Sequence, residues 1–286
     1  MKNEKSRGTM LVSSAVILCA VTFVAGFACG NMVAEHRAVS RSVTAAAPAP
    51  APAPEAAPAA PASTNASNAE AQAQHIGHLR DEARQNPDSA DAWTKLGNAC
   101  FDAGDAEGAI EAYQASLRLE PGNADVRTDM GSMYRMKGEP ARAVECYDQA
   151  LKDHPGHRNA IFNKGVTMML DLEQPEQAVE FWQSVLREYP GLTLSSGAEL
   201  SKIMPEIVVD AALQLEAHGR KVVALRAYEQ ALKLDPSFAP ALVHGAWLME
   251  GMGRAADAQP LWKRVLERYP DATDPAGKPV RDHITK

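Results

Sequence analysis

The sequence predicts an all-α protein built as an α-solenoid of five helical hairpins. Two observations predict it: prolines recur at near-constant intervals, and the segments between them carry small and aromatic residues at matching offsets. The prolines are Pro87, Pro121, Pro155, Pro190, Pro236 and Pro270, at intervals of 34, 34, 35, 46 and 34 residues. A repeat of this length is typical of stacked helical units rather than of one globular core.

Each segment holds two amphipathic helices. Apolar residues recur at helical spacing in two runs, and a polar break such as Ala103-Gly104-Asp105 separates the runs. Small residues such as Gly97 and Ala109 stand where the two helices must cross at an axial separation of about 8–10 Å. A proline then ends the second helix, because it cannot continue the hydrogen-bond ladder.

The hairpins share a sequence pattern. The first unit reads Trp93-x2-Leu96-Gly97-x2-Cys100, then Ala109-x3-Tyr113, then Pro121. The five units are 90–123, 124–157, 158–192, 205–238 and 239–272. The pattern resembles the tetratricopeptide repeat (TPR) family, whose 34-residue unit reads W-x2-L-G-x2-Y…A-x3-F…P. This sequence departs from the pattern at two positions: Cys100 stands where an aromatic residue is usual, and Arg127 stands where Trp is usual.

The interval before Pro236 exceeds one period by twelve residues, roughly 193–204. Ser196 and Glu199 have the spacing of a capping box, so we expect either a short extra helix or an extended first helix in unit four, with Pro205 near its start. Units three and five also resemble each other, since each ends in Trp, a Leu four residues on, and Tyr-Pro. Two arrangements are open: two blocks, 88–192 and 205–272, joined by the insert, or one stack carrying the insert as a loop.

Residues 10–34 form an uncharged run of 25 residues rich in Val, Ala, Leu, Ile and Phe. A helix of that length is about 37 Å long and could cross about 30 Å of hydrocarbon. Basic residues within 1–9 favour a cytoplasmic amino-terminal tail, with the run as a single transmembrane signal-anchor helix. A cleaved signal peptide is the alternative. Cys29 is less suited to lipid attachment, because Gly26 stands where an aliphatic residue is usual.

Residues 35–69 are rich in Ala and Pro and then in Ser, Thr and Asn. Such a segment cannot bury a core, and we expect a disordered, fairly stiff linker. Helical character resumes at Glu70, so 70–87 is expected to be a lone helix that covers the open end of unit one. The tail, 273–286, carries Val280 and Ile284 on one helical face and is expected to cover unit five.

The composition argues against several classes of function. The net charge is −7, and nucleic-acid partners call for a basic stripe, so the charge argues against nucleic acid as a partner. No P-loop, H-E-x-x-H, G-x-S-x-G or C-x-x-C pattern occurs, which predicts no enzyme, no catalytic residues and no cofactor.

The histidine pairs His75/His78 and His154/His157 lack the third and fourth ligands of a metal site, so we expect exposed histidines and no metal. Cys100 and Cys146 fall in packed helices of adjacent units. We expect two buried reduced thiols, with a disulfide as the alternative.

The resemblance implies a concave groove lined by the first helix of each hairpin, mainly at repeat positions 2, 5, 9, 12 and 13. These positions change from polar in units one and two to apolar in units three to five, which suits the apolar face of an amphipathic helix. For the aliphatic members, packing against the next helix is the alternative. Thr94 stands where carboxylate-gripping members carry Lys, so a carboxylate clamp is not expected. The candidate partner-binding residues are Asn98, Phe101, Arg135, Phe162, Val166, Met169, Leu213, Val243 and Trp247.

Anchor, spacer and repeats together are similar to membrane-anchored bacterial envelope TPR proteins, some of which assist cytochrome c maturation. We therefore expect an inner-membrane scaffold with its repeats in the periplasm, which binds a protein or peptide and aids assembly or maturation of an envelope protein. The alternative is a homo-oligomeric assembly factor of an envelope complex, although oligomerisation is not expected to be obligatory.

Overall fold

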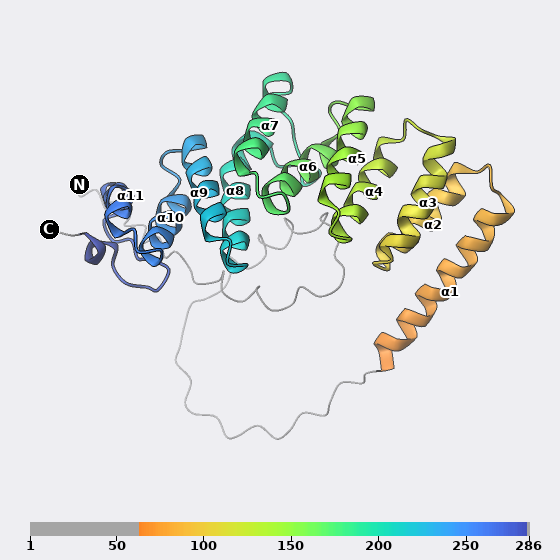
Figure 1. The fold of residues 1–286 in the computed structure, drawn as a ribbon, viewed down its shortest axis with the longest axis horizontal. Helices are drawn as coiled ribbons and strands as arrows, with labels where there is room; N and C mark the ends of the chain where they lie inside the picture. The colour runs from red at the N-terminus through yellow and green to blue at the C-terminus, as the bar shows by residue number, and fades with distance from the viewer. Residues whose placement is uncertain (1–62, 285–286) are drawn as a thin grey trace, which may run out of the picture. The chain divides into compact units, whose positions relative to one another are not determined.

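A computed structural model describes residues 63–284 (Figure 1). Their contacts divide them between residues 155 and 156 into two compact units. This part of the chain contains eleven α-helices and one 3-10 helix, and its only β-type pairings are two isolated bridges. The all-α helical-hairpin prediction is therefore confirmed for the described residues.

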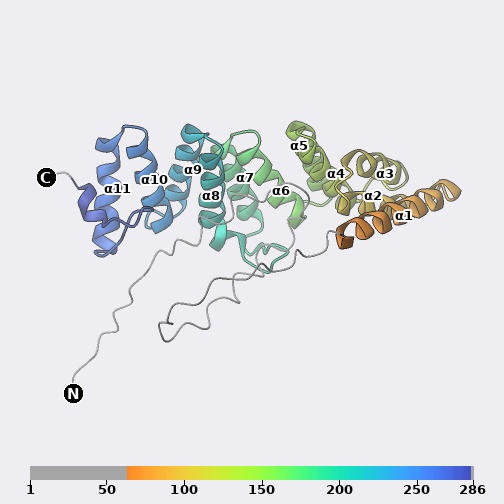
Figure 2. The same cartoon turned by 90° about the horizontal axis from the view of Figure 1, so that it is seen from below.

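The first unit contains a lone helix followed by repeats one and two. Neighbouring helices contact each other in chain order, as Figure 2 shows. The helices are α1 (Ser63–Gln85), α2 (Ala90–Asp102), α3 (Ala106–Leu119), α4 (Ala124–Met136) and α5 (Pro140–Asp153).

The covering helix α1 begins earlier than predicted. It starts at Ser63 rather than at Glu70, so the last residues assigned to the linker are helical. No proline follows Pro61 before Pro87, and the polar residues between them form one continuous helix with the amphipathic part. Leu79 and Ala83 are buried, and α1 contacts α2. Helix α1 therefore packs against the first helix of repeat one.

The second unit contains repeats three to five and ends in a single 3-10 turn. Its helices are α6 (Arg158–Leu170), α7 (Pro175–Glu188), α8 (Leu200–Ala217), α9 (Lys221–Leu234), α10 (Ala239–Gly251), α11 (Ala255–Arg268) and η3 (Val280–His283). Within this unit α6 contacts α8, and α9 contacts both α7 and α10, so the hairpins are stacked.

Glycines in the left-handed region form most of the hairpin turns. Gly104, Gly138, Gly219 and Gly253 have φ of 73°, 75°, 76° and 78°. Repeat three, which has one extra residue here, carries Glu173 at φ 58° instead. A side chain is strained in that region. The Glu173 carboxylate lies 2.5 Å from Nη2 of Arg220, and its carbonyl accepts from Nη2 of Arg226. These contacts join the turn of repeat three to repeat four.

An aromatic side chain from the second helix fills the core of every hairpin. These residues are Tyr113, Tyr147, Trp182, Tyr228 and Trp262, and each has at most 1% exposure. In repeats one to three the ring lies directly on a glycine of the first helix, at a distance that a Cβ atom would not allow. The predicted role of small residues at the helix crossing is confirmed there.

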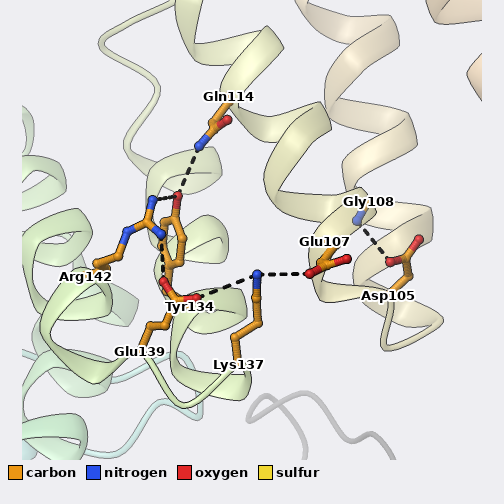
Figure 3. Close-up of polar contacts among 8 residues, drawn as sticks. All are labelled: Asp105, Glu107, Gly108, Gln114, Tyr134, Lys137, Glu139 and Arg142. Atoms are coloured by element: carbon orange, nitrogen blue, oxygen red, sulfur yellow. Dashed lines mark hydrogen bonds and ion pairs between the residues drawn. The ribbon is translucent and has the colours of Figure 1, made fainter.

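Repeats one and two are joined by a polar network (Figure 3). The Tyr134 hydroxyl accepts from Gln114 of α3 at 3.0 Å and from Arg142 of α5 at 2.7 Å. Lys137 lies 3.2 Å from Glu107 of α3 and 3.6 Å from Glu139. These contacts fix α4 between the hairpin before it and its own second helix.

The insert extends the first helix of repeat four, which was one of the two expected forms. Helix α8 runs from Leu200 and includes Pro205 in its second turn. The predicted capping box is wrong: Glu199 is the N-cap and makes no side-chain capping bond, while the Ser196 hydroxyl accepts from the Ala198 amide. Buried Leu194 and Leu200 show that the insert packs against the rest of the second unit.

The segment after repeat five repeats the backbone of the insert at an offset of 80 residues. Leu194 N donates to Ala198 O at 2.8 Å, and Asp274 N donates to Lys278 O at 2.7 Å. Leu200 N and Val280 N each close the loop with a 2.9 Å bond. The loop glycines, 197 and 277, have φ of 81° and 83°. Val280 is fully buried and η3 contacts α11, so this part of the tail packs on repeat five. The 3-10 turn ends at His283, so Ile284 does not share a helical face with Val280.

Within residues 63–284, no helix combines the length and the apolar character needed to cross a bilayer. The predicted transmembrane segment, 10–34, and most of the predicted linker lie outside the described residues.

Candidate protein-binding groove

Most of the predicted groove residues have accessible side chains. Asn98 is exposed, and six of the others are half-buried. Asn98 and Phe101 are three residues apart on α2, and Phe162 and Val166 are four apart on α6, so each pair shares one helix face. The other half-buried members are Arg135 of α4, Leu213 of α8 and Trp247 of α10.

Two predicted residues do not line an open surface. Met169 has no exposure and Val243 has 4% exposure, so both are packing residues. Val243 stands at repeat position 5, where Thr128 and Val209 are also buried. In repeat one the side chain at this position faces the second helix, since the Thr94 hydroxyl lies 2.7 Å from that of Ser116 in α3. Repeat three differs, because Phe162 stands at position 5 and is half-buried. Met169 belongs to the repeat that the insert follows and whose first helix, α6, contacts α8.

The core aromatic residues hold the groove-side residues in place. Tyr113 donates from its hydroxyl to Asn98 Oδ1 at 2.9 Å. The hydroxyls of Tyr147 and Ser132 are 3.4 Å apart. Asn98 and Ser132 both stand at repeat position 9 of the first helix. The second helix therefore restrains a side chain at a predicted groove position of the first helix.

In repeats four and five the core aromatic residue instead donates a hydrogen bond to a glutamate at repeat position 12 of the first helix. Tyr228 donates to Glu216 Oε2 at 3.2 Å, and Trp262 Nε1 donates to Glu250 Oε1 at 2.8 Å. Burial raises the pKa of Glu216. The second unit is therefore not simply apolar on its first-helix face. The sequence prediction missed both glutamates, although position 12 of the repeat frame marks them.

A cavity of about 350 Å³ lies beside Asn98 in the first unit. It is lined by α1 and α2, which places the covering helix next to a predicted groove residue. Its lining residues are Gln72, His75, Leu79, Lys95, Asn98, Ala99 and Asp102. Lys95, one of the polar lining residues, is paired with Asp91 at 2.6 Å.

Asp129 of α4 is a half-buried carboxylate. Burial, followed by the charges of Asp125 and Asp102, raises its pKa to about 6. Perturbed carboxylates of this kind are enriched at functional sites. A cationic group of a partner near Asp129 would offset the cost of its charge.

Trp247, the candidate groove residue of repeat five, is partly covered by the carboxyl-terminal segment. The His283 ring lies edge-on to the Trp247 ring, with centroids 6.1 Å apart, and stacks on Trp262 at 4.7 Å. His283 thus lies against the predicted groove residue of repeat five.

Cys100 and Cys146 are buried free thiols, as expected. Burial raises the pKa of both and brings that of Cys146 to about 11. His75, His78 and His154 are exposed, whereas His157 is half-buried and its Nδ1 accepts from the Ala160 amide as the cap of α6. No group of three or more potential metal ligands occurs within residues 63–284.

Two protein-family models match parts of this chain. Residues 52–191 match the model described as the cytochrome c-type biogenesis protein H TPR domain. Residues 241–272 match the tetratricopeptide repeat model. The chain belongs to the tetratricopeptide repeat family. Its TPR hairpins are α2–α3, α4–α5, α6–α7, α8–α9 and α10–α11.

Several solved TPR structures are similar to this TPR chain. MamA is 21% identical, with a TM-score of 0.41, over 64% of this chain and 92% of MamA. YrrB, described as a TPR protein with an unusual peptide-binding site, is 18% identical, with a TM-score of 0.42, over 68% and 93%. PilF of Pseudomonas aeruginosa is 21% identical, with a TM-score of 0.40, over 73% and 88%. Comparison with curated proteins found no match.

Proposed function

We propose that this TPR protein is a scaffold that binds a protein or peptide partner on the groove side of its first helices. The observation that carries the proposal is the set of groove-side residues held by the core aromatics, such as Asn98 by Tyr113. A preordered side chain loses less conformational entropy on binding, which favours recognition. Half-buried Phe101 and Phe162 supply the apolar contacts for an amphipathic segment.

We further propose that the partner is an envelope protein under maturation, in c-type cytochrome biogenesis. The support is the match of residues 52–191 to the TPR domain of cytochrome c-type biogenesis protein H. That match includes α1 and repeats one to three, so it contains the cavity beside Asn98 and the candidate residues up to Met169.

The proposed location is the bacterial inner membrane, with residues 10–34 as an uncleaved anchor and the repeats in the periplasm. The support is the apolar run itself and the basic residues before it. Alkaline extraction of membranes and the mass of the mature chain test this. Release of a shortened chain into the soluble fraction would contradict the anchor.

The groove is tested by photocrosslinking in living cells. A photoreactive residue at Phe162 or Phe101 is expected to capture a protein partner, which mass spectrometry identifies. Leu119, which is 40% exposed on the second helix α3, is the matched control position and is expected to capture none of that partner. Equal capture from all three positions would contradict groove binding. Capture of a second copy of this chain alone would favour the homo-oligomeric alternative.

A further inference from the structure

A compact acidic and aromatic notch lies on repeat five. Trp247 and Trp262 supply its rings, and Glu250 and Asp274 supply its carboxylates. The Asp274 side chain has no exposure and that of Glu250 has 21%. Asp274 also accepts from the amides of Ala276 and Lys278 at 2.8 Å each, and Glu250 accepts from Trp262. Both carboxylates and the Trp262 ring are therefore held in place by hydrogen bonds within the chain.

The chain's own His283 fills this notch. Its Nδ1 lies 2.7 Å from Glu250 Oε2, and its Nε2 lies 2.9 Å from Asp274 Oδ2. A carboxylate can only accept a hydrogen bond, so the ring satisfies both carboxylates when both of its nitrogens carry hydrogen. The Trp262 face, stacked on the ring, also favours a cation. The notch is thus complementary to a flat cationic group.

A loop with this backbone can also close without a charged arrangement. In the insert, which has the same backbone hydrogen bonds, Leu194 stands at the position of Asp274 and Ile203 at the position of His283. Repeat position 12 is Met169 in repeat three and Glu250 in repeat five. The aliphatic version closes the same loop, so the charged set in repeat five serves something beyond loop closure.

We propose that the notch is a binding site for a basic side chain, of the imidazolium or guanidinium type, and that His283 occupies it as an internal ligand. A partner peptide that presents such a side chain displaces the carboxyl-terminal segment and gains access to Trp247. The partner's role rests on the proposed function, because Trp247 and Glu250 stand at groove positions 9 and 12. The chemical preference of the notch is a property of the chain alone.

The first test replaces the internal ligand by a free one. His283→Ala is made in the full-length chain, and tryptophan fluorescence is followed during titration with imidazole at pH 6, where imidazole is largely cationic. Saturable binding is expected in His283→Ala and none in the wild type. Pyrazole, which has a similar shape and no charge, is expected to bind His283→Ala about tenfold more weakly than imidazole does. Imidazole is expected to bind the double variant Glu250→Gln/His283→Ala about tenfold more weakly than it binds His283→Ala. In both cases one charge-assisted hydrogen bond is lost. Arg281→Ala, at an exposed neighbouring position, is the control.

A second test holds even if His283→Ala releases the loop. Hydrogen exchange at the Asp274, Gly277 and Val280 amides reports loop closure, because all three donate within the loop. His283→Arg is expected to retain their protection, whereas His283→Leu is expected to lose most of it. If the amides keep their protection in His283→Leu and lose it in His283→Arg, the site is apolar and the proposal is overturned. Equal binding of pyrazole and imidazole in the first test would also overturn it.

The cationic preference of the notch and the binding function of the groove can each fail without the other. If imidazole binds as expected but Phe162 captures no partner, the notch stands and the groove function fails. If Phe162 captures a partner and the notch shows no cationic preference, the groove function stands and this proposal fails.

Discussion

The Tyr113 hydroxyl donates a hydrogen bond to Asn98 Oδ1 across 2.9 Å, from the core of repeat one to its exposed face. Burial raises the pKa of Tyr113, so the hydroxyl keeps its proton and remains a donor at physiological pH. A core residue thereby determines how a groove residue is presented. The same relationship, with different partners, recurs in repeats four and five.

Tyr113→Phe is expected to lower the free energy of unfolding by roughly 0.5–1.5 kcal/mol, the net value of one hydrogen bond. Tyr147→Phe, whose hydroxyl is 3.4 Å from that of Ser132, is the matched variant and should cost less. Urea denaturation measures both. A double-mutant cycle of Tyr113→Phe with Asn98→Ala should show coupling, and additive effects would contradict the role assigned to the pair.

Gly165→Ala is expected to destabilise the protein by roughly 1–3 kcal/mol, because the new Cβ would overlap the buried Trp182 ring. Gly245→Ala is the matched control: its nearest neighbour would be Tyr228 Cβ at 3.5 Å. There the helix propensity of Ala should stabilise by up to about 1 kcal/mol. Thermal unfolding of the two variants compares them directly, and equal effects would contradict the close crossing in repeat three.

Asp129→Asn is expected to stabilise the protein at pH 7.5 by roughly 1–2 kcal/mol. The folded-state pKa of Asp129, about 6, lies above its ordinary value of 3.8, so the folded chain binds this proton more tightly than the unfolded chain does. Asp129 therefore favours the folded state less as the pH rises from about 4 through 6. Urea denaturation across that range should show a smaller pH-dependent loss in Asp129→Asn. Destabilisation by this variant at pH 7.5 would contradict the assigned cause.

Cys100 and Cys146 are expected to react with a thiol reagent at pH 7.5 at least about 100-fold more slowly than in urea, since only the thiolate reacts and burial restricts access. Peptide mapping after labelling distinguishes these two thiols from Cys19 and Cys29. Rapid labelling of Cys146 in the folded chain would contradict its raised pKa and its burial.

The hairpins could be predicted because each is specified locally. The proline spacing, the small residues at the helix crossing and the aromatic residue of the second helix all lie within one 34-residue unit. The excess length before Pro236 predicts extra helical structure there, but it leaves open whether a separate helix or the extended α8 forms. The start of α1 at Ser63 was missed because polar residues without proline carry little helical periodicity.

The candidate site was less predictable, because burial depends on what packs over a helix. Met169 and Val243 stand at groove positions of the repeat frame, yet the fold buries both. Glu216 and Glu250 are not among the predicted residues, although each accepts a hydrogen bond from a core aromatic residue.

Local sequence is enough to specify the repeat architecture, because helix periodicity, close crossings and chain breaks are short-range properties of each unit. Which groove positions are open, and what already occupies them, depends on packing between segments far apart in the chain. His283 reaches Glu250 only because the chain after α11 folds back over repeat five, a contact between residues 33 apart that no local pattern encodes.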